Sequence, residues 1–523
     1  MSTSLRRDLS LTSLTLAVVT GTIGSGWLLA PYFTARLAGS ASLLAWIVGG
    51  VMAFLLALVF AELGSLIPSS GALAQIPLLS HGRLSGFIGG WGVWLTYMAL
   101  PAIELLALFD YISSNLPWLT VEQNGDELLS PAGHGLAVLL IILLCWINLN
   151  GVKSLAQWID GLTIWKLLIP LLLSVVLMAF SGHWGNLTVD VGGPEGSDIV
   201  QAVGSGGILF SLLGFRTAMD LAGEARNPSR DVPLAMAIGL GICLLLYLIL
   251  QLAFLVSVPP DALAHGWHHL KLTAHGGPMV ALAITSGLGW IVALLLLDAV
   301  ITPAATALTY VGVAGRISWM MGKCSLLPKS LGTLNQQGIP HIAVILSAIV
   351  SALMLAVGPG WQTVVSFLTS TLIIALATGP VSLMALRRQL PDNHRGFRLL
   401  QAEWLCPLSF VLSTWAITWC GTAALEGATL CIAVPSLIFA LHRLLHQKAV
   451  EIYSALWWPL YLGLLILDME FFDKEAPFAL TEVSQLLVQS VIALVLFPIA
   501  VNSALSKPSP HALFPVKLTT EDV

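Results

Sequence analysis

Apolar residues dominate the chain in long runs, and short polar segments separate these runs. About 20 consecutive apolar residues let an α-helix cross a bilayer, so runs of this kind predict transmembrane helices. The pattern predicts about fourteen of them. Their ranges are 12–36, 41–67, 86–115, 133–149, 155–180, 199–222, 233–257, 279–310, 341–357, 361–386, 404–422, 425–445, 453–468 and 483–504.

A glycine-rich stretch, Thr20 to Gly26, interrupts the first apolar run. Each Gly costs a helix about 1 kcal/mol relative to Ala, and broken backbone at membrane depth occurs where it lines a cavity or is buried in protein. A half-helix beginning near Gly26 would direct its free N–H groups at an anion such as a carboxylate. The alternative interpretation is close helix packing, because Gly21 and Gly24 are small residues at a spacing that suits helix contacts.

The sixth run contains a second candidate break at Gly214. Interrupted helices at corresponding positions of two halves are a sequence indication of a transporter built on an inverted repeat. Taken alone, Gly214 fits helix packing equally well.

Composition supports the membrane interpretation. Of the 523 residues, 57% are hydrophobic and only 9% are charged, whereas a soluble domain has about 25% charged residues. The six cysteines show no C-x-x-C pair and no metal-ligand spacing, so we expect packed thiols without disulfides or a metal site. The first run is too long for a signal peptide and is expected to be retained.

Basic residues are distributed unevenly between alternate loops. With the N-terminus inside, 17 Lys and Arg residues fall on the cytoplasmic side, and only Lys271 and Lys474 fall outside. This bias predicts a multi-pass protein of the plasma (inner) membrane with both termini in the cytoplasm. The predicted organisation is a cytoplasmic segment at 1–11, a transport core at 12–400, additional transmembrane helices at 401–505 and a cytoplasmic tail at 506–523.

Two cations, Lys166 and Arg216, lie deep within predicted helices, and Asp298 lies in a very apolar part of another. An intramembrane charge is expensive and is by default a functional hypothesis. Glu62 and Glu224 lie near inner helix ends, where we expect them to hold loops in place.

Several motifs occur in a characteristic order. They are Gly21-x-Ile23-Gly24-Ser25-Gly26, then Ala61-Glu62-Leu63-Gly64-Ser65-Leu66-Ile67-Pro68-x-x-Gly71, then Gly214-Phe215 with Gly223-Glu224-x-x-Asn227-Pro228-x-Arg230-x-x-Pro233, and finally Arg316, Leu326-Leu327-Pro328-Lys329 and Gly338-Ile339-Pro340. On these residues, over roughly 10–400, the chain resembles the amino acid–polyamine–organocation (APC) superfamily of permeases.

The resemblance implies an all-α polytopic fold with a LeuT-like core of two inverted five-helix repeats, in which helices 1 and 6 are unwound around the substrate. It also implies a substrate site. Backbone N–H groups of Thr22, Ile23, Gly24, Ser25 and Gly26 would bind an α-carboxylate. Carbonyls around Phe210 and Leu213, beside Gly214, would accept from an α-ammonium. Phe210 falls where the family often has an aromatic lid, although a single Phe in a membrane helix also serves ordinary packing.

Lys166 resembles the fifth-helix lysine of proton-coupled family members. A desolvated ammonium gives up its proton more readily, so this residue could gain and lose a proton during transport. The alternative is a lysine that reaches lipid phosphate or Asp160. Asp298 is expected to neutralise Lys166 or Arg216, or to carry a proton itself.

Arg216 departs from the family pattern, because many members have Gly-Phe-Glu where this chain has Gly-Phe-Arg. A guanidinium is not deprotonated in proteins, but it binds carboxylates in bidentate fashion. Arg216 therefore suggests an acidic substrate. The alternative is a structural ion pair with Asp298, Glu104 or Asp220.

These observations predict a secondary transporter, most simply a proton symporter for an amino acid such as aspartate or glutamate. An exchanger of amino acids or amines is the second hypothesis. A membrane-embedded enzyme would need a nucleophile–base pair or metal ligands at mid-depth; the histidines lie mostly in predicted loops, and neither H-E-x-x-H nor G-x-S-x-G occurs. A sensor would usually bring a soluble signalling domain, for which the segment after 505 is short. The expected partners are an amino acid, protons and lipid, with no cofactor and no nucleic acid; the sequence leaves the oligomeric state open.

Overall fold

The computed structural model describes residues 9–510 except 114, 124–125, 151, 190, 192–197, 273–275, 356–360, 392–394, 448–450, 473–477 and 479, and leaves out the side chains of 122–127 and 152–160. Most of the two predicted cytoplasmic termini lies outside this description. So do several basic residues that enter the predicted orientation, namely Arg6, Arg7, Lys153, Lys448, Lys474 and Lys517. The side chain of Asp160, the alternative partner of Lys166, is not described either.

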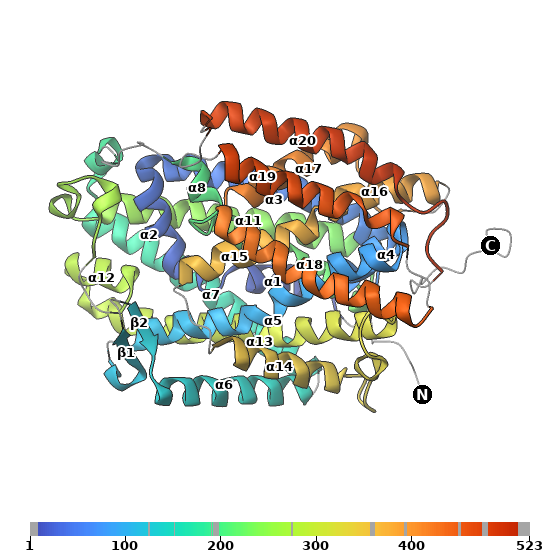
Figure 1. The fold of residues 1–523 in the computed structure, drawn as a ribbon. Helices are drawn as coiled ribbons and strands as arrows, with labels where there is room; N and C mark the ends of the chain where they lie inside the picture. Colours follow the sequence, from blue (N-terminus) through green and yellow to red (C-terminus); the bar gives the residue numbers. More distant parts are fainter. Residues whose placement is uncertain are drawn as a thin grey trace.

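Helices make up nearly all of the described chain (Figure 1). The first half contains α1 (Leu11–Thr22), α2 (Gly26–Ala38), α3 (Ser42–Leu66), α4 (Ala72–His81), α5 (Arg83–Ser113), the hairpin of β1 (Thr120–Gln123) and β2 (Asp126–Leu129), α6 (Pro131–Leu149), α7 (Val152–Ser181), α8 (Ile199–Val203), α9 (Ile208–Leu212), the 3₁₀ turn η4 (Leu213–Arg216), α10 (Thr217–Asp220) and α11 (Pro228–Ser257). The second half contains α12 (Pro278–Thr285), α13 (Gly289–Lys323), α14 (His341–Met354), α15 (Trp361–Leu376), α16 (Thr378–Gln389), α17 (Ala402–Thr418), α18 (Thr422–Leu445), α19 (Trp457–Phe472) and α20 (Glu482–Asn502).

The protein is an all-α polytopic membrane protein. Within the described residues, eleven helical stretches are long and apolar enough to cross a membrane, and α1 and α14 are shorter apolar helices. Every predicted apolar range overlaps described helix. The count of about fourteen crossings stays a prediction, since α2 and α3 join into one stretch and two helices are short.

Four predicted runs are divided, and local chemistry explains the divisions. The first run breaks at Ile23–Ser25. The run 279–310 divides around Gly287, whose φ of +72° favours glycine. The run 361–386 divides at Ala377, because Pro380 has no N–H to give the preceding turn of helix.

The sixth run has two interruptions. The predicted one is present as the 3₁₀ turn η4, which contains Gly214. The second was not predicted: α8 ends at Val203, and α9 begins only after Gly207, whose φ is +95°. The span is therefore a series of short helical pieces.

Helices α5 and α13 pack side by side, and α18 packs against α15 and α5. Of the apolar window of α5, 89% is buried, against 22% for α18. Large apolar side chains on α18, such as Leu430 and Leu437, are exposed. Because such a surface is stable only in an apolar medium, α18 faces the lipid.

The two ends of the helix bundle differ, and Figure 1 shows them at its left and right. We call the end with the β1–β2 hairpin, α8 and the start of α15 the lid end. The opposite end, with α4, α16 and residues 503–510, is the terminal end. There the backbone N–H groups of Leu505 and Ser509 donate to the carbonyls of Ser80 (3.0 Å) and Leu79 (2.8 Å), which satisfies the last turn of α4.

Candidate functional site

The interruptions of the first and sixth runs meet each other. A Cβ placed on Gly214 would lie 2.1 Å from Oγ1 of Thr22 and 2.6 Å from the carbonyl carbon of Gly21. Only a glycine permits this approach. The small residues therefore bring the two broken segments into contact. Close helix packing and a helix break, which were alternative interpretations of the sequence, both occur here.

Side chains from three neighbouring helices cap the carbonyl end of α1. Four successive carbonyls accept hydrogen bonds: Thr20 from Lys166 Nζ (3.0 Å), Gly21 from the Tyr310 hydroxyl (2.7 Å), Thr22 from the Tyr247 hydroxyl (3.1 Å) and Ile23 from Thr306 Oγ1 (3.1 Å). These carbonyls have no partner within the helix because α1 stops here. The break is thus fixed by α7, α11 and α13.

Lys166 is fully buried on α7. Besides the Thr20 carbonyl, its ammonium contacts Oγ1 of Thr306 at 2.5 Å. A cation at the carbonyl end of a helix is stabilised by the helix dipole. No described carboxylate lies within 4 Å of Lys166, so its close contacts are the backbone of the break and a hydroxyl.

Asp298 lies on α13 and is also fully buried. Its Oδ1 accepts a hydrogen bond from Thr302 at 2.8 Å, while Oδ2 has no hydrogen-bond partner. Thr302 and Thr306 are one helical turn apart, and the Thr306 hydroxyl is within reach of the Thr302 carbonyl (3.1 Å). Asp298 and Lys166 thus contact the same turn of α13 without forming an ion pair.

The amide end of the break is occupied by Glu104, a fully buried acid of α5. The backbone N–H of Ser25 donates to Oε2 at 2.7 Å, and the Ser25 hydroxyl donates to Oε1 at 3.2 Å. A Cβ on Gly24 would lie 2.4 Å from the same carboxylate. The N-terminus of α2 therefore binds a carboxylate, as its dipole favours, and the chain itself supplies this one.

The sequence interpretation assigned Glu104 only as a possible partner of Arg216 and missed this contact. One signal was available: Glu104 interrupts a long apolar run, and acids rarely occur in such runs without a function. Its actual partner lies 79 positions away in the sequence, so no local pattern identifies it.

Phe210 lies at the lid end of the site, together with two further aromatic residues. Trp361, the first residue of α15, packs edge-on against Phe210 with ring centroids 6.0 Å apart. It also stacks on Phe33 of α2 at 5.5 Å. Its indole N–H donates to Oγ of Ser25 at 3.1 Å.

Arg216 lies on the opposite side of the break, between two tyrosine rings. Its guanidinium carbon is 5.1 Å from the ring centre of Tyr97 and 5.4 Å from that of Tyr310. One of its terminal nitrogens donates to the Leu213 carbonyl, and its Nε has no hydrogen-bond partner. The predicted substrate-binding carbonyl of Leu213 therefore contacts Arg216 in this state of the protein.

None of the carboxylates proposed as structural partners forms an ion pair with Arg216 within 4 Å. Asp220 accepts instead from the Tyr97 hydroxyl at 2.5 Å, and Asp298 and Glu104 are engaged as described above. A buried guanidinium with an unused N–H is costly. The Nε–H group of Arg216 is therefore available to a further hydrogen-bond acceptor.

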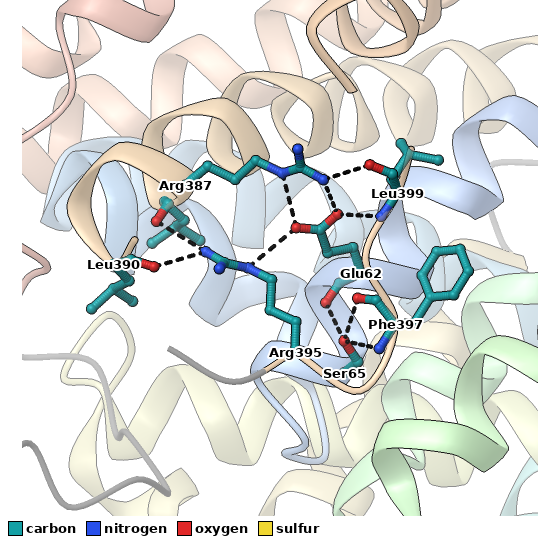
Figure 2. A network of polar contacts seen from close by, with 8 residues as sticks. Glu62, Ser65, Arg387, Leu390, Arg395, Phe397 and Leu399 are labelled. Carbon is teal, nitrogen blue, oxygen red and sulfur yellow. Dashed lines mark hydrogen bonds and ion pairs between the residues drawn. The ribbon is translucent and has the colours of Figure 1, made fainter. Parts of the chain in front are cut away.

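Glu62 and Glu224 tie helices together at the terminal end, as expected. Figure 2 shows Glu62 of α3 between Arg387 and Arg395, with separations of 2.5 and 3.2 Å. Oε2 of Glu62 also accepts from the backbone N–H of Leu399 at 2.7 Å. Glu224 pairs with Arg316 of α13 at 2.6 Å.

Most of the cysteines are packed in the interior of the protein. All six are free thiols, and five are buried, while Cys431 is exposed on the lipid-facing helix α18. In the described part of the chain, no group of three or more His, Cys, Asp or Glu side chains is arranged to hold a metal ion.

Interrupted helices that meet around buried charges characterise a class of membrane transport proteins, and comparison with known sequences identifies the family. A family profile described as amino acid permease matches residues 9–441. The chain therefore belongs to the amino acid permease family, within the APC superfamily.

Individual relatives agree with this assignment. The glutamate/serine transporter AimA of Bacillus subtilis is 32% identical over 425 residues, which cover 79% of this chain and 78% of that protein. The aspartate-proton symporter of the same organism is 30% identical over 418 residues, with 80% of each chain covered. The branched-chain amino acid permease BcaP, also of B. subtilis, is 24% identical over 433 residues, covering 80% of this chain and 87% of that protein.

Proposed function

We propose that this permease is a proton-coupled symporter that takes up an acidic amino acid across the plasma membrane. The proposal includes a LeuT-like core in which the helices of residues 12–400 form two inverted five-helix repeats, with the terminal end in the cytoplasm. The observation that carries it is the arrangement of charge at the break of the first helix. Lys166 binds the carbonyl end, and Glu104 binds the amide end.

Glu104 gives the site a means of coupling substrate to protons. A substrate α-carboxylate would seek the N–H groups of Gly24 to Gly26, where the Glu104 carboxylate now binds Ser25. Two carboxylates that share one site do not both stay ionised. Substrate binding therefore favours protonation of Glu104, and release of the substrate favours loss of that proton.

Lys166 and Asp298 complete the proposed relay. When the ammonium of Lys166 is charged, it stabilises the carbonyl end of α1 as a bound metal ion would. Its hydroxyl neighbour Thr306 is on the same helix as Asp298, so a proton could pass between the acid and the lysine through threonine hydroxyls or an intervening water. Lys166 and Glu104 form hydrogen bonds to the broken segment, whereas the described hydrogen bond of Asp298 is to Thr302.

Arg216 is the proposed determinant of acidic substrates. It is buried, it has an unused N–H, and no described carboxylate pairs with it. Two relatives with names that refer to glutamate or aspartate are about 30% identical to this chain. A side-chain carboxylate at Arg216 and an α-carboxylate at the Ser25 amide would together select a dicarboxylic amino acid.

The coupling is tested in proteoliposomes with labelled aspartate or glutamate. Uptake is expected to rise when the outside is acidified and to collapse with a protonophore. Glu104→Gln should abolish the dependence on the pH gradient while exchange of internal for external substrate continues. Lys166→Ala should also lose gradient-driven uptake; intact uptake in this variant would favour an exchanger, and insensitivity of the wild type to the protonophore would reject symport.

The role of Arg216 is tested by substrate competition. A hydrogen-bonded charged pair contributes about 1.5–3 kcal/mol, so Arg216→Gln should weaken acidic relative to neutral substrates by roughly 10- to 100-fold. Arg216→Lys, which keeps the charge but loses the bidentate geometry, should retain part of the preference. Unchanged selectivity in Arg216→Gln would assign this residue to structure.

A further inference from the structure

We infer that Trp361 is a lid residue that is held in place, through Ser25, by the carboxylate bound at the amide end of the break. No motif singled out this tryptophan. It nevertheless contacts both interrupted spans at the lid end. The inference rests on the proposed function only in that the break must bind an amino acid.

The contacts of Trp361 span both breaks. On the side of the first span, its N–H donates to Ser25 at 3.1 Å and its ring stacks on Phe33 with the planes 10° apart. On the side of the sixth span, its ring meets Phe210 edge-on at 85°. A Cβ on Gly207 would lie 2.9 Å from the tip of the same indole, so the break between α8 and α9 is shaped to receive it.

The hydrogen bonds form a chain with one direction. The indole nitrogen is only a donor, so the Ser25 oxygen accepts from Trp361. The Ser25 hydroxyl then donates its own proton to Oε1 of Glu104 at 3.2 Å. Hydrogen bonds in such chains polarise one another, and the bond at the lid is therefore strongest while Ser25 faces an ionised carboxylate.

This chain connects the lid to the carboxylate site. With a carboxylate at the Ser25 amide, whether from Glu104 or from a substrate, Ser25 keeps its orientation and Trp361 keeps its partner. When the carboxylate leaves, the Ser25 hydroxyl loses its acceptor, and the indole N–H loses a well-oriented oxygen. The lid end is thus held closed as long as a carboxylate, that of Glu104 or of a substrate, binds Ser25. Trp361 acts on the substrate through Ser25, which makes it a positioning residue.

Closure of the lid end is measured in purified protein, by an assay that does not depend on transport. Ser211 lies on α9 next to the break, is 1% exposed, and would almost touch a Cβ on Gly26, the first residue of α2. We would introduce Ser211→Cys into a variant in which the six native cysteines are alanine, and follow its modification by a maleimide in purified protein. Adding Trp361→Ala should accelerate the modification at least tenfold. Adding Trp361→Phe, which keeps a ring but removes the donor, should give a smaller acceleration.

The chain offers a matched control. Trp91 of α5 is also partly buried, stacks on an aromatic neighbour, and donates one hydrogen bond to a backbone carbonyl, that of Cys431, at 2.9 Å. Trp91→Phe should leave the modification rate of the introduced thiol unchanged. A rate that rises equally in the Trp91 and Trp361 variants would reflect general loosening and would overturn the inference.

A second measurement separates positioning from packing. In the transport assay, Trp361→Phe in the wild-type chain should raise KM about fivefold, the equivalent of one hydrogen bond of about 1 kcal/mol, and should leave the maximal rate nearly unchanged. An unchanged modification rate in Trp361→Ala would overturn the lid, whatever the substrate or the coupling ion proves to be. If uptake proves independent of protons while the modification rates follow the expected order, the lid stands and the symport proposal falls.

Discussion

The lid end and the terminal end close the same central site by different chemistry. At the lid end, three aromatic rings, Phe33, Phe210 and Trp361, meet with a single hydrogen bond to Ser25. At the terminal end, the carboxylates of Glu62 and Glu224 bind three arginines across helices that are far apart in the sequence. The aromatic contacts at the lid end are largely non-directional, whereas the ion pairs at the terminal end depend on the geometry of the charged groups.

The difference has energetic consequences. Aromatic pairs contribute about 0.5–1.5 kcal/mol beyond the area they bury, so rings can separate and repack at small cost. A buried ion pair is only weak evidence of net stability, but removal of one partner is costly because it leaves an uncompensated charge. The lid end is therefore suited to graded opening, whereas the terminal end is suited to two distinct states.

The largest expected effect is at the terminal end. Arg387→Ala leaves Glu62, which is fully buried, with Arg395 at 3.2 Å and the backbone N–H of Leu399 at 2.7 Å as its remaining partners. Because breaking a buried pair costs about 3–5 kcal/mol, we expect a loss of about 3 kcal/mol, seen as earlier thermal unfolding in detergent. Arg388→Ala is the control, since Arg388 is the exposed neighbour bonded to Asn502. Equal effects of the two substitutions would remove the contrast between the ends.

An intermediate effect concerns pH. His81, the last residue of α4, is buried at the terminal end, where burial lowers its pKa from 6.5 to about 4. The unfolded chain therefore binds this proton near pH 6.5, and the folded chain binds it only near pH 4. Stability should fall as the pH drops from about 7 towards 4, by at most ~2 kcal/mol between pH 7 and 5.

The comparison of His81→Gln with wild type isolates this effect. The variant should lose much of the acid sensitivity in thermal unfolding between pH 7 and 5, whereas His446→Gln, at an exposed position, should retain it. If both variants respond to acid as the wild type does, His81 does not contribute to the pH dependence of the terminal end.

The smallest effect is expected at the lid end. Phe33→Leu removes one stacked ring from Trp361 but keeps an apolar side chain. We expect a loss of about 1 kcal/mol or less in stability, measured by the same unfolding assay. A loss of stability as large as that of Arg387→Ala would show that the aromatic contacts contribute as much stability as the ion pairs.

The sequence predicted the helical runs, because apolar length reports directly on the bilayer. It also located the break at Ile23–Ser25 and the buried position of Lys166. The contact of Glu104 with Ser25 and that of Trp361 with the same residue were not predictable. Each depends on how distant helices pack against one another, and hydrophobic periodicity carries no information about the partner of a side chain.

The interruption at Gly204–Gly207 shows a different limit. The sequence contains Gly204, Gly206 and Gly207, but a glycine cluster near the end of an apolar run is also typical of the end of a span. In the structure, Gly207 takes a positive φ and receives the indole of Trp361. The packing of Trp361 against Gly207 is what distinguishes a functional interruption from a frayed helix end.

The backbone hydrogen bonds from Leu505 and Ser509 to the last turn of α4 impose an order on biosynthesis. Helix α4 leaves the ribosome well before Leu505 and Ser509, the residues that donate to its carbonyls. At about 5–20 residues per second, roughly 20 to 90 s separate the two events. During that interval the last turn of α4 lacks these two hydrogen bonds, which form only after Leu505 and Ser509 have been made.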